Sequence, residues 1–180
     1  MERKGNYIQT YTGVRFYPFD PKAEEINIID IAAALSKICR FTGHTSRFYS
    51  VAQHSVLCSN IAPPELALHA LMHDATEAYL GDVAQPIKQM KEMRFYKKAE
   101  AVLEFMIFGK YNIEYGNFRQ VKEIDNRILF TEKRDLLEVD LDWGYSIEAY
   151  EEKIKPIPPE QALREFLNRF KQLSNLSLQE

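Results

Sequence analysis

The chain has 180 residues, a length that favours one domain able to bury its own core. Its net charge of −3 argues against a surface that coats nucleic acid, and 46% hydrophobic with 27% charged residues is ordinary for a globular protein. Two cysteines are too few for a disulfide framework, and no apolar run is long enough to cross a membrane. We therefore expect a single cytoplasmic domain over residues 1–180, without a membrane or extended nucleic acid among its partners.

The N-terminal part of the chain mixes short elements of different kinds. Residues 7–19 combine aromatic and β-branched side chains, which favours a short β-hairpin or an extended arm. Asp30 then resembles the start of a helix that continues through residues 31–38. Residues 40–50 hold a glycine among polar and aromatic side chains, and this mixture predicts a loop. We therefore expect one helix here, flanked by an arm and a loop.

Helical periodicity dominates the remainder of the chain. A stretch rich in acidic and aromatic side chains, residues 138–152, shows no clear pattern. The predicted fold class is therefore all-α, a compact helical bundle whose core spans about residues 28–138. The expected helices cover residues 50–61, 64–80, 87–109, 119–138 and, at the C-terminus, 159–173.

Three of the expected helices carry a titratable side chain inside an apolar stripe, namely His54, Asp74 and Asp125. An ionised carboxylate inside a protein needs a partner, so one shared divalent metal would account for these residues together with His73. Such a mixture of imidazole and carboxylate donors suits Mn, Fe, Co, Ni or Zn better than Ca, and leaves Mg open. Four protein ligands would also leave coordination positions for water and substrate oxygens, as a catalytic site requires.

Two further carboxylates lie close to this predicted site. Glu77 is one helical turn from His73 and could take a proton from water, and Asp82 is a second candidate for that role. The alternative for Asp82 is a solvated turn residue that follows a helix-ending glycine. His69 shares the helix face of His73, which favours packing or support of a ligand. We read the cysteines, Cys39 and Cys58, as buried free thiols.

The segments 51–55, 71–77 and 81–88 resemble the HD-domain metal-dependent phosphohydrolases, and more narrowly the small 5′-nucleotidases and deoxynucleoside triphosphate triphosphohydrolases. The resemblance covers about residues 40–136 and rests on an ordered set of His, His-Asp and a distant Asp. It implies an HD-domain helical fold that binds one divalent metal. The implied ligands are His54, His73, Asp74 and Asp125; Glu132 fits the acidic end of the motif, and Asp135, Asp140 and Asp142 are rivals for the last ligand.

The resemblance also assigns roles on the substrate side. It implies that Glu77 and Asp82 handle the nucleophilic water and that Lys88 contacts the substrate phosphate. Arg40 and Phe41 resemble an Arg-Trp pair that contacts nucleotide in relatives. His44 and Arg47 share their loop and are further candidates for substrate contacts.

These roles predict a divalent-metal-dependent phosphohydrolase of small nucleotides. A 5′-nucleotidase would release phosphate from a monophosphate, whereas a triphosphohydrolase would release tripolyphosphate. Two alternatives stay open, a cyclic or oligonucleotide phosphodiesterase and a non-catalytic metal-binding scaffold. Because small relatives often form dimers or rings, we also expect a homo-oligomer.

Overall fold

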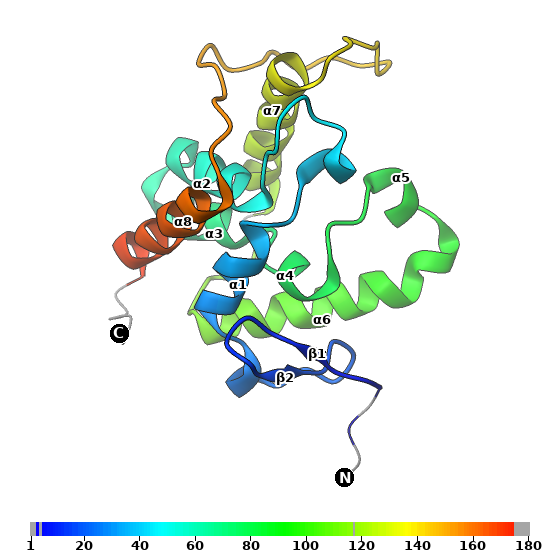
Figure 1. Ribbon diagram of the computed structural model, residues 1–180, viewed down its shortest axis with the longest axis vertical. Coiled ribbons are helices and arrows are strands. Elements are labelled where there is room, and N and C mark those ends of the chain that lie inside the picture. Colours follow the sequence, from blue (N-terminus) through cyan, green and yellow to red (C-terminus); the bar gives the residue numbers. More distant parts are fainter. Residues whose placement is uncertain (1–2, 4, 117, 175–180) are drawn as a thin grey trace.

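The computed structural model describes residue 3, residues 5–116 and residues 118–174, so both ends of the expected 1–180 domain reach beyond the described residues. Helices dominate this part of the chain, and its strands form one antiparallel hairpin. The prediction of an all-α fold is therefore confirmed, and the N-terminal segment takes the hairpin form (Figure 1). The elements are β1 (Ile8–Gln9), β2 (Arg15–Phe16), α1 (Ile28–Leu35), α2 (Val51–Ile61), α3 (Ala67–Met72), α4 (Glu77–Leu80), α5 (Gln85–Lys88), α6 (Arg94–Lys110), α7 (Phe118–Leu136) and α8 (Pro159–Leu173).

The start of α1 differs from the prediction. The side chain of Asn27 accepts a hydrogen bond from the backbone N–H of Ile29 at 2.9 Å, so Asn27 is the N-cap and the helix begins at Ile28. Asp30, expected at the helix start, lies buried in the first turn instead. Its carboxylate accepts hydrogen bonds from the backbone N–H and the hydroxyl of Thr12, at 2.6 and 2.9 Å. Asp30 therefore ties the hairpin to α1.

Two expected helices are each broken into two. The expected helix over residues 64–80 is interrupted at residues 73–76, where the backbone forms tight i→i−3 hydrogen bonds such as Glu77 N–H to the Asp74 carbonyl at 3.0 Å. His73 and Thr76 keep dihedral angles close to helical values, and no glycine or proline marks the break in the sequence. The expected helix over residues 87–109 is divided into α5 and α6 by a short connection.

Helix α2 occupies the centre of the bundle and packs against α3, α7 and α8. Ser50 caps its N-terminus by accepting a hydrogen bond from the N–H of Gln53 at 3.2 Å. In Figure 1 the hairpin lies beside α6 at one end of the molecule, and the connection from α7 to α8 runs over the opposite end. This arrangement brings α2, α7 and the turn at residues 73–76 side by side. Among the described residues, no helix has the length and apolarity needed to span a bilayer.

Candidate metal centre

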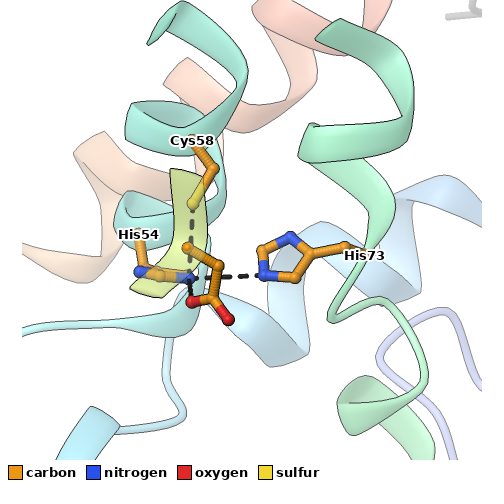
Figure 2. Close-up of side chains that lie close together, drawn as sticks. His54, Cys58 and His73 are labelled. Atoms are coloured by element: carbon orange, nitrogen blue, oxygen red, sulfur yellow. Dashed lines mark hydrogen bonds and ion pairs between the residues drawn. The ribbon is translucent and has the colours of Figure 1, made fainter. Parts of the chain in front are cut away.

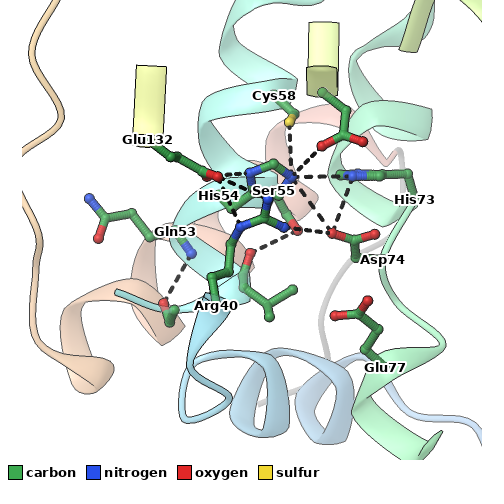
Figure 3. Close-up of polar contacts among 12 residues, drawn as sticks. Arg40, Gln53, His54, Ser55, Cys58, His73, Asp74, Glu77 and Glu132 are labelled. Atoms are coloured by element: carbon green, nitrogen blue, oxygen red, sulfur yellow. Dashed lines mark hydrogen bonds and ion pairs between the residues drawn. The ribbon is translucent and has the colours of Figure 1, made fainter. Parts of the chain in front are cut away.

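Three side chains from two other parts of the chain converge around His54 of α2 (Figure 3). Its Nε2 lies 3.4 Å from Nε2 of His73, 3.2 Å from Oδ1 of Asp125 and 3.6 Å from Oδ2 of Asp74. Nε2 of His73 is itself 3.2 Å from Oδ2 of Asp74. The four residues expected as metal ligands are therefore brought together.

Local backbone structure explains why these side chains meet. His73 and Asp74 lie in the turn between α3, which packs on α2, and α4, which packs on α1. Asp125 and Glu132 are seven residues apart on α7, a separation of two helical turns that places both on the face toward α2. The apolar side chains that give α2 and α7 their amphipathic pattern lie on the same faces as these polar residues, so these faces are buried between the helices.

The orientation of both imidazole rings is set by a partner on Nδ1. Nδ1 of His54 donates to Oε1 of the buried Glu132 at 2.7 Å, and Nδ1 of His73 donates to the backbone carbonyl of Ala70 at 2.8 Å. In a neutral ring the proton is then on Nδ1, and each Nε2 directs a lone pair toward the carboxylates of Asp74 and Asp125. Acceptor atoms facing one another at 3.2–3.6 Å repel unless a proton or a cation lies among them. The donor chemistry therefore fits a bound cation.

The sequence interpretation missed one member of this cluster. Sγ of Cys58 lies 3.4 Å from Nε2 of His54, one turn away on α2 (Figure 2). Potential ligand atoms of His54, Cys58, His73 and Asp125 all lie within 4.8 Å of one another, so this group could hold a metal ion. The i, i+4 spacing was available in the sequence, where Cys58 was read as a buried free thiol. Cys58 is indeed buried, whereas Cys39 is only half-buried.

The ionisation of the cluster reflects its mutual contacts. Burial raises the pKa of Asp74, but His73 and His54 outweigh it and hold that pKa well below the usual range. Burial likewise opposes ionisation of Asp125, and its hydrogen bond with His54 again lowers the pKa. The pKa of His54 is lowered by burial and by Arg40, yet anionic groups including Glu132 raise it well above its usual value. The carboxylates of Asp74 and Asp125 thus stay ionised, and a positive charge between them would stabilise the cluster.

A cavity of about 530 Å³ opens beside the cluster, and the two expected water-handling carboxylates line it. Oε2 of Glu77 is buried and has no hydrogen-bond partner among the described residues. Burial and the neighbouring Asp74 and Asp82 carboxylates raise the pKa of Glu77 well above its usual value. Burial also raises the pKa of Asp82. Nζ of Lys88 contacts Oε1 of Glu77 at 3.6 Å and Oε1 of Glu100 at 2.8 Å.

The loop after α1 divides the expected substrate contacts into two groups. Arg40 and Phe41 line the cavity, and Nε and Nη2 of Arg40 donate to Oε2 of Glu132 at 3.1 and 2.9 Å. Phe41 and Thr42 have φ angles of +53° and +52°, a strained conformation that directs this turn toward the cavity. His44 and Arg47 are exposed and lie outside the cavity lining.

The connection between α7 and α8, which showed no clear sequence pattern, supplies two aromatic rings to the cavity. Trp143 and Tyr145 line its wall, and both rings pack against Phe130 with centroids 5.6 and 5.2 Å away. The ring of His69 packs edge-on against Phe108, 4.9 Å away. The rival ligands are held elsewhere: Asp135 by Arg134 and Ile154, Asp140 by Lys133, and Asp142 by the N–H of Gly144.

Comparison with known proteins gives a relative for nearly the whole chain. No protein-family model matches it. The chain is 43% identical over 175 residues to the uncharacterized protein YfdR of Escherichia coli (strain K12), covering 95% of this chain and 97% of YfdR. It is also 40% identical over 86 residues to an uncharacterized protein of Rhodobacter capsulatus, covering 43% of this chain and 44% of that protein. The chain therefore belongs to the same family as YfdR of Escherichia coli.

Proposed function

We propose that the protein is a divalent-metal-dependent phosphohydrolase of small nucleotides, either a 5′-nucleotidase or a deoxynucleoside triphosphate triphosphohydrolase. The observation that carries the proposal is the buried oxygen of Glu77, which lacks a hydrogen-bond partner among the described residues and lines the same cavity as Asp74 and Asp125. A purely structural metal site has no need of such a carboxylate beside its ligands. The cavity volume of about 530 Å³ falls in the range of small-molecule sites.

The metal-binding part of the proposal rests on His54, His73, Asp74 and Asp125. Their nitrogen and oxygen donors suit Mn, Fe, Co, Ni or Zn, and Mg is also compatible with the carboxylates. When bound, a divalent ion supplies Lewis acidity and makes water more acidic. Acidic side chains outnumber basic ones in the cavity lining, so an anionic substrate requires that additional positive charge.

The remaining steps use side chains of the chain itself. Glu77 accepts the proton of the attacking water, a role that its raised pKa favours because a more basic carboxylate takes up a proton more readily. Asp82 lies at the same cavity and orients the water. Lys88, whose charge the carboxylates of Glu100 and Glu77 maintain, offsets the charge of the phosphate together with Arg40.

Aromatic side chains in the cavity wall support a nucleotide rather than a simple phosphate ester as the substrate. Phe41 lies on one loop, and Trp143 and Tyr145 lie on the connection between α7 and α8. Planar rings of this kind stack with nucleobases, with a gain of about 1–3 kcal/mol per base. Because Trp143 is the single tryptophan of the chain, a stacked base would quench the intrinsic fluorescence of the protein.

The test is a panel of nucleoside mono- and triphosphates with Mn²⁺ or Co²⁺, in which phosphate and tripolyphosphate are measured separately. We expect one of the two products, its loss with chelator, and a decrease of about 10²- to 10⁴-fold in Glu77→Gln. Glu123→Gln is the control, because that side chain is exposed on α7 away from the cavity. Phosphate release that is unchanged in His73→Ala would refute the proposal.

A further inference from the structure

We propose that Cys58 binds the metal ion directly through its sulfur, so that the donor set includes a thiolate beside the imidazoles of His54 and His73. The inference rests on the metal centre that the proposed function requires, but not on the reaction or its substrate. Cys58 is fully buried at the edge of an apolar cluster, and its sulfur lies 3.4 Å from Nε2 of His54, next to the other donors (Figure 2).

Three separations measured from Nε2 of His54 match those expected between ligands of one ion, and the other donor pairs of the group lie within 4.8 Å. With metal–sulfur and metal–nitrogen bonds of about 2.3 and 2.05 Å and tetrahedral angles, a sulfur and a nitrogen are about 3.5 Å apart and two nitrogens about 3.3 Å apart. The observed separations from Nε2 of His54 are 3.4 Å to Sγ of Cys58 and 3.4 Å to Nε2 of His73. Oδ1 of Asp125 is 3.2 Å from the same nitrogen, close to the corresponding nitrogen–oxygen separation.

The charges near the cluster also balance with a thiolate present. The anions are Asp74, Asp125, Glu132 and the thiolate of Cys58. Two cationic side chains oppose them: Arg40 contacts Glu132 and Asp74, and Nζ of Lys122 lies 2.6 Å from Oδ2 of Asp125. The two charges of a divalent ion complete the balance. Arg40 is largely buried and Lys122 is more than half exposed, so the balance reduces the penalty for burying the donors without removing it.

A sulfur ligand changes which metals the site prefers. Thiolate is a soft donor that favours Zn²⁺, Co²⁺ or Cd²⁺ over Mg²⁺ and Mn²⁺, which prefer oxygen. Replacing the sulfur by oxygen in Cys58→Ser should therefore weaken Zn²⁺ and Cd²⁺ binding by at least about tenfold. Mn²⁺ binding should change much less, because the imidazoles and carboxylates remain.

The test uses the full chain, freed of metal with chelator and then loaded with Co²⁺. Direct bonding predicts a near-ultraviolet sulfur-to-cobalt charge-transfer band in the wild type, and its loss in Cys58→Ser. Cys39→Ser is the matched control and keeps the band, because Cys39 is half-buried and outside the cluster. Circular dichroism of each variant checks that the helices remain.

The outcomes separate this inference from the proposed function. Visible ligand-field bands of bound Co²⁺ without the charge-transfer band in the wild type would overturn Cys58 as a ligand, whatever the activity. A band that persists in Cys58→Ser would do the same. The band together with no hydrolysis of any nucleotide would support the ligand while refuting the proposed function.

Discussion

Glu132 is the side chain on which the geometry of the cluster depends most, and replacing it by glutamine tests that dependence. Its carboxylate is fully buried and is shared by His54, through Nδ1 at 2.7 Å, and by Arg40, through Nε and Nη2. Glutamine keeps the shape of the side chain but removes the charge that Arg40 neutralises. The hydrogen bond from Nδ1 of His54 would then be accepted by a neutral amide oxygen instead of a carboxylate. This weaker hydrogen bond would hold the tautomer of His54 less firmly.

The expected magnitudes follow from these contacts. Removing one partner of a buried charge pair costs about 3–5 kcal/mol of folding free energy. Because the amide oxygen of Glu132→Gln can still accept a hydrogen bond, we expect a loss of about 3 kcal/mol, at the lower end of this range. Loss of a group that orients a metal-binding histidine typically lowers metal affinity about 10- to 100-fold, or about 1.4–2.8 kcal/mol. Domains of this size have about 5–15 kcal/mol of stability, so the variant should remain folded.

The assays are urea unfolding in chelator, followed by circular dichroism, and a competitive Zn²⁺ titration of the folded protein. Glu123→Gln on the same helix is the control: its carboxylate is 62% exposed and pairs with Arg119 at 3.0 Å, so the expected loss is below about 0.5 kcal/mol. Wild-type Zn²⁺ affinity in Glu132→Gln would refute the orienting role. Wild-type stability would refute the energetic importance of the buried pair.

Four further changes have defined expectations. Burial and Arg40 lower the pKa of His54, but its anionic neighbours outweigh them and raise this pKa in the folded protein. Protonated His54 therefore stabilises the metal-free fold fully below its usual pKa of about 6.5, and this stabilisation is lost as the pH rises through the raised pKa. Urea unfolding in chelator should therefore show falling stability above about pH 6.5, while Zn²⁺ affinity rises over the same range as protons leave; a flat stability profile would contradict this. Asn27→Ala should cost about 1 kcal/mol in urea unfolding through loss of the cap of α1, whereas no change would place the helix start elsewhere. Thr42→Gly should raise the unfolding free energy by about 1 kcal/mol, since glycine relieves its φ of +52°; destabilisation would argue against strain there. Asp82→Ala should reduce nucleotide turnover about 10²-fold or more, and full turnover would remove Asp82 from the proposed mechanism.

The parts of the fold that follow local rules were predictable from the sequence. Helix α2 has a serine cap and α8 begins at a proline, and both start within a residue or two of the expected position. The break at residues 73–76 was not predictable, because the residues there have no helix-breaking side chains and the turn is stabilised by packing beside α2. Asp30 shows the opposite error: a plausible local cap is occupied by a contact with Thr12, eighteen residues away.

The same distinction applies to the site. The sequence could predict that His54, Asp74 and Asp125 lie together, because polar side chains in apolar stripes need partners and one shared partner accounts for all three. Trp143 and Tyr145 could not be assigned to the cavity, since their positions depend on how a segment without regular structure crosses the end of the bundle. Cys58 had the right spacing, but a cysteine among apolar residues is usually an ordinary core residue.

The clustered histidines and aspartates and the aromatic side chains of the cavity wall lie in parts of the chain that tolerate amino-acid substitution to different degrees. The donors lie on packed helices and on a turn between them, where a substitution disturbs the core. Trp143 and Tyr145 lie on a surface connection, where sequence can vary with little effect on folding. We therefore expect members of this family to vary more at positions 143 and 145 than at the four clustered side chains. Under the proposed function, such differences would change which nucleotide is bound and leave the reaction the same.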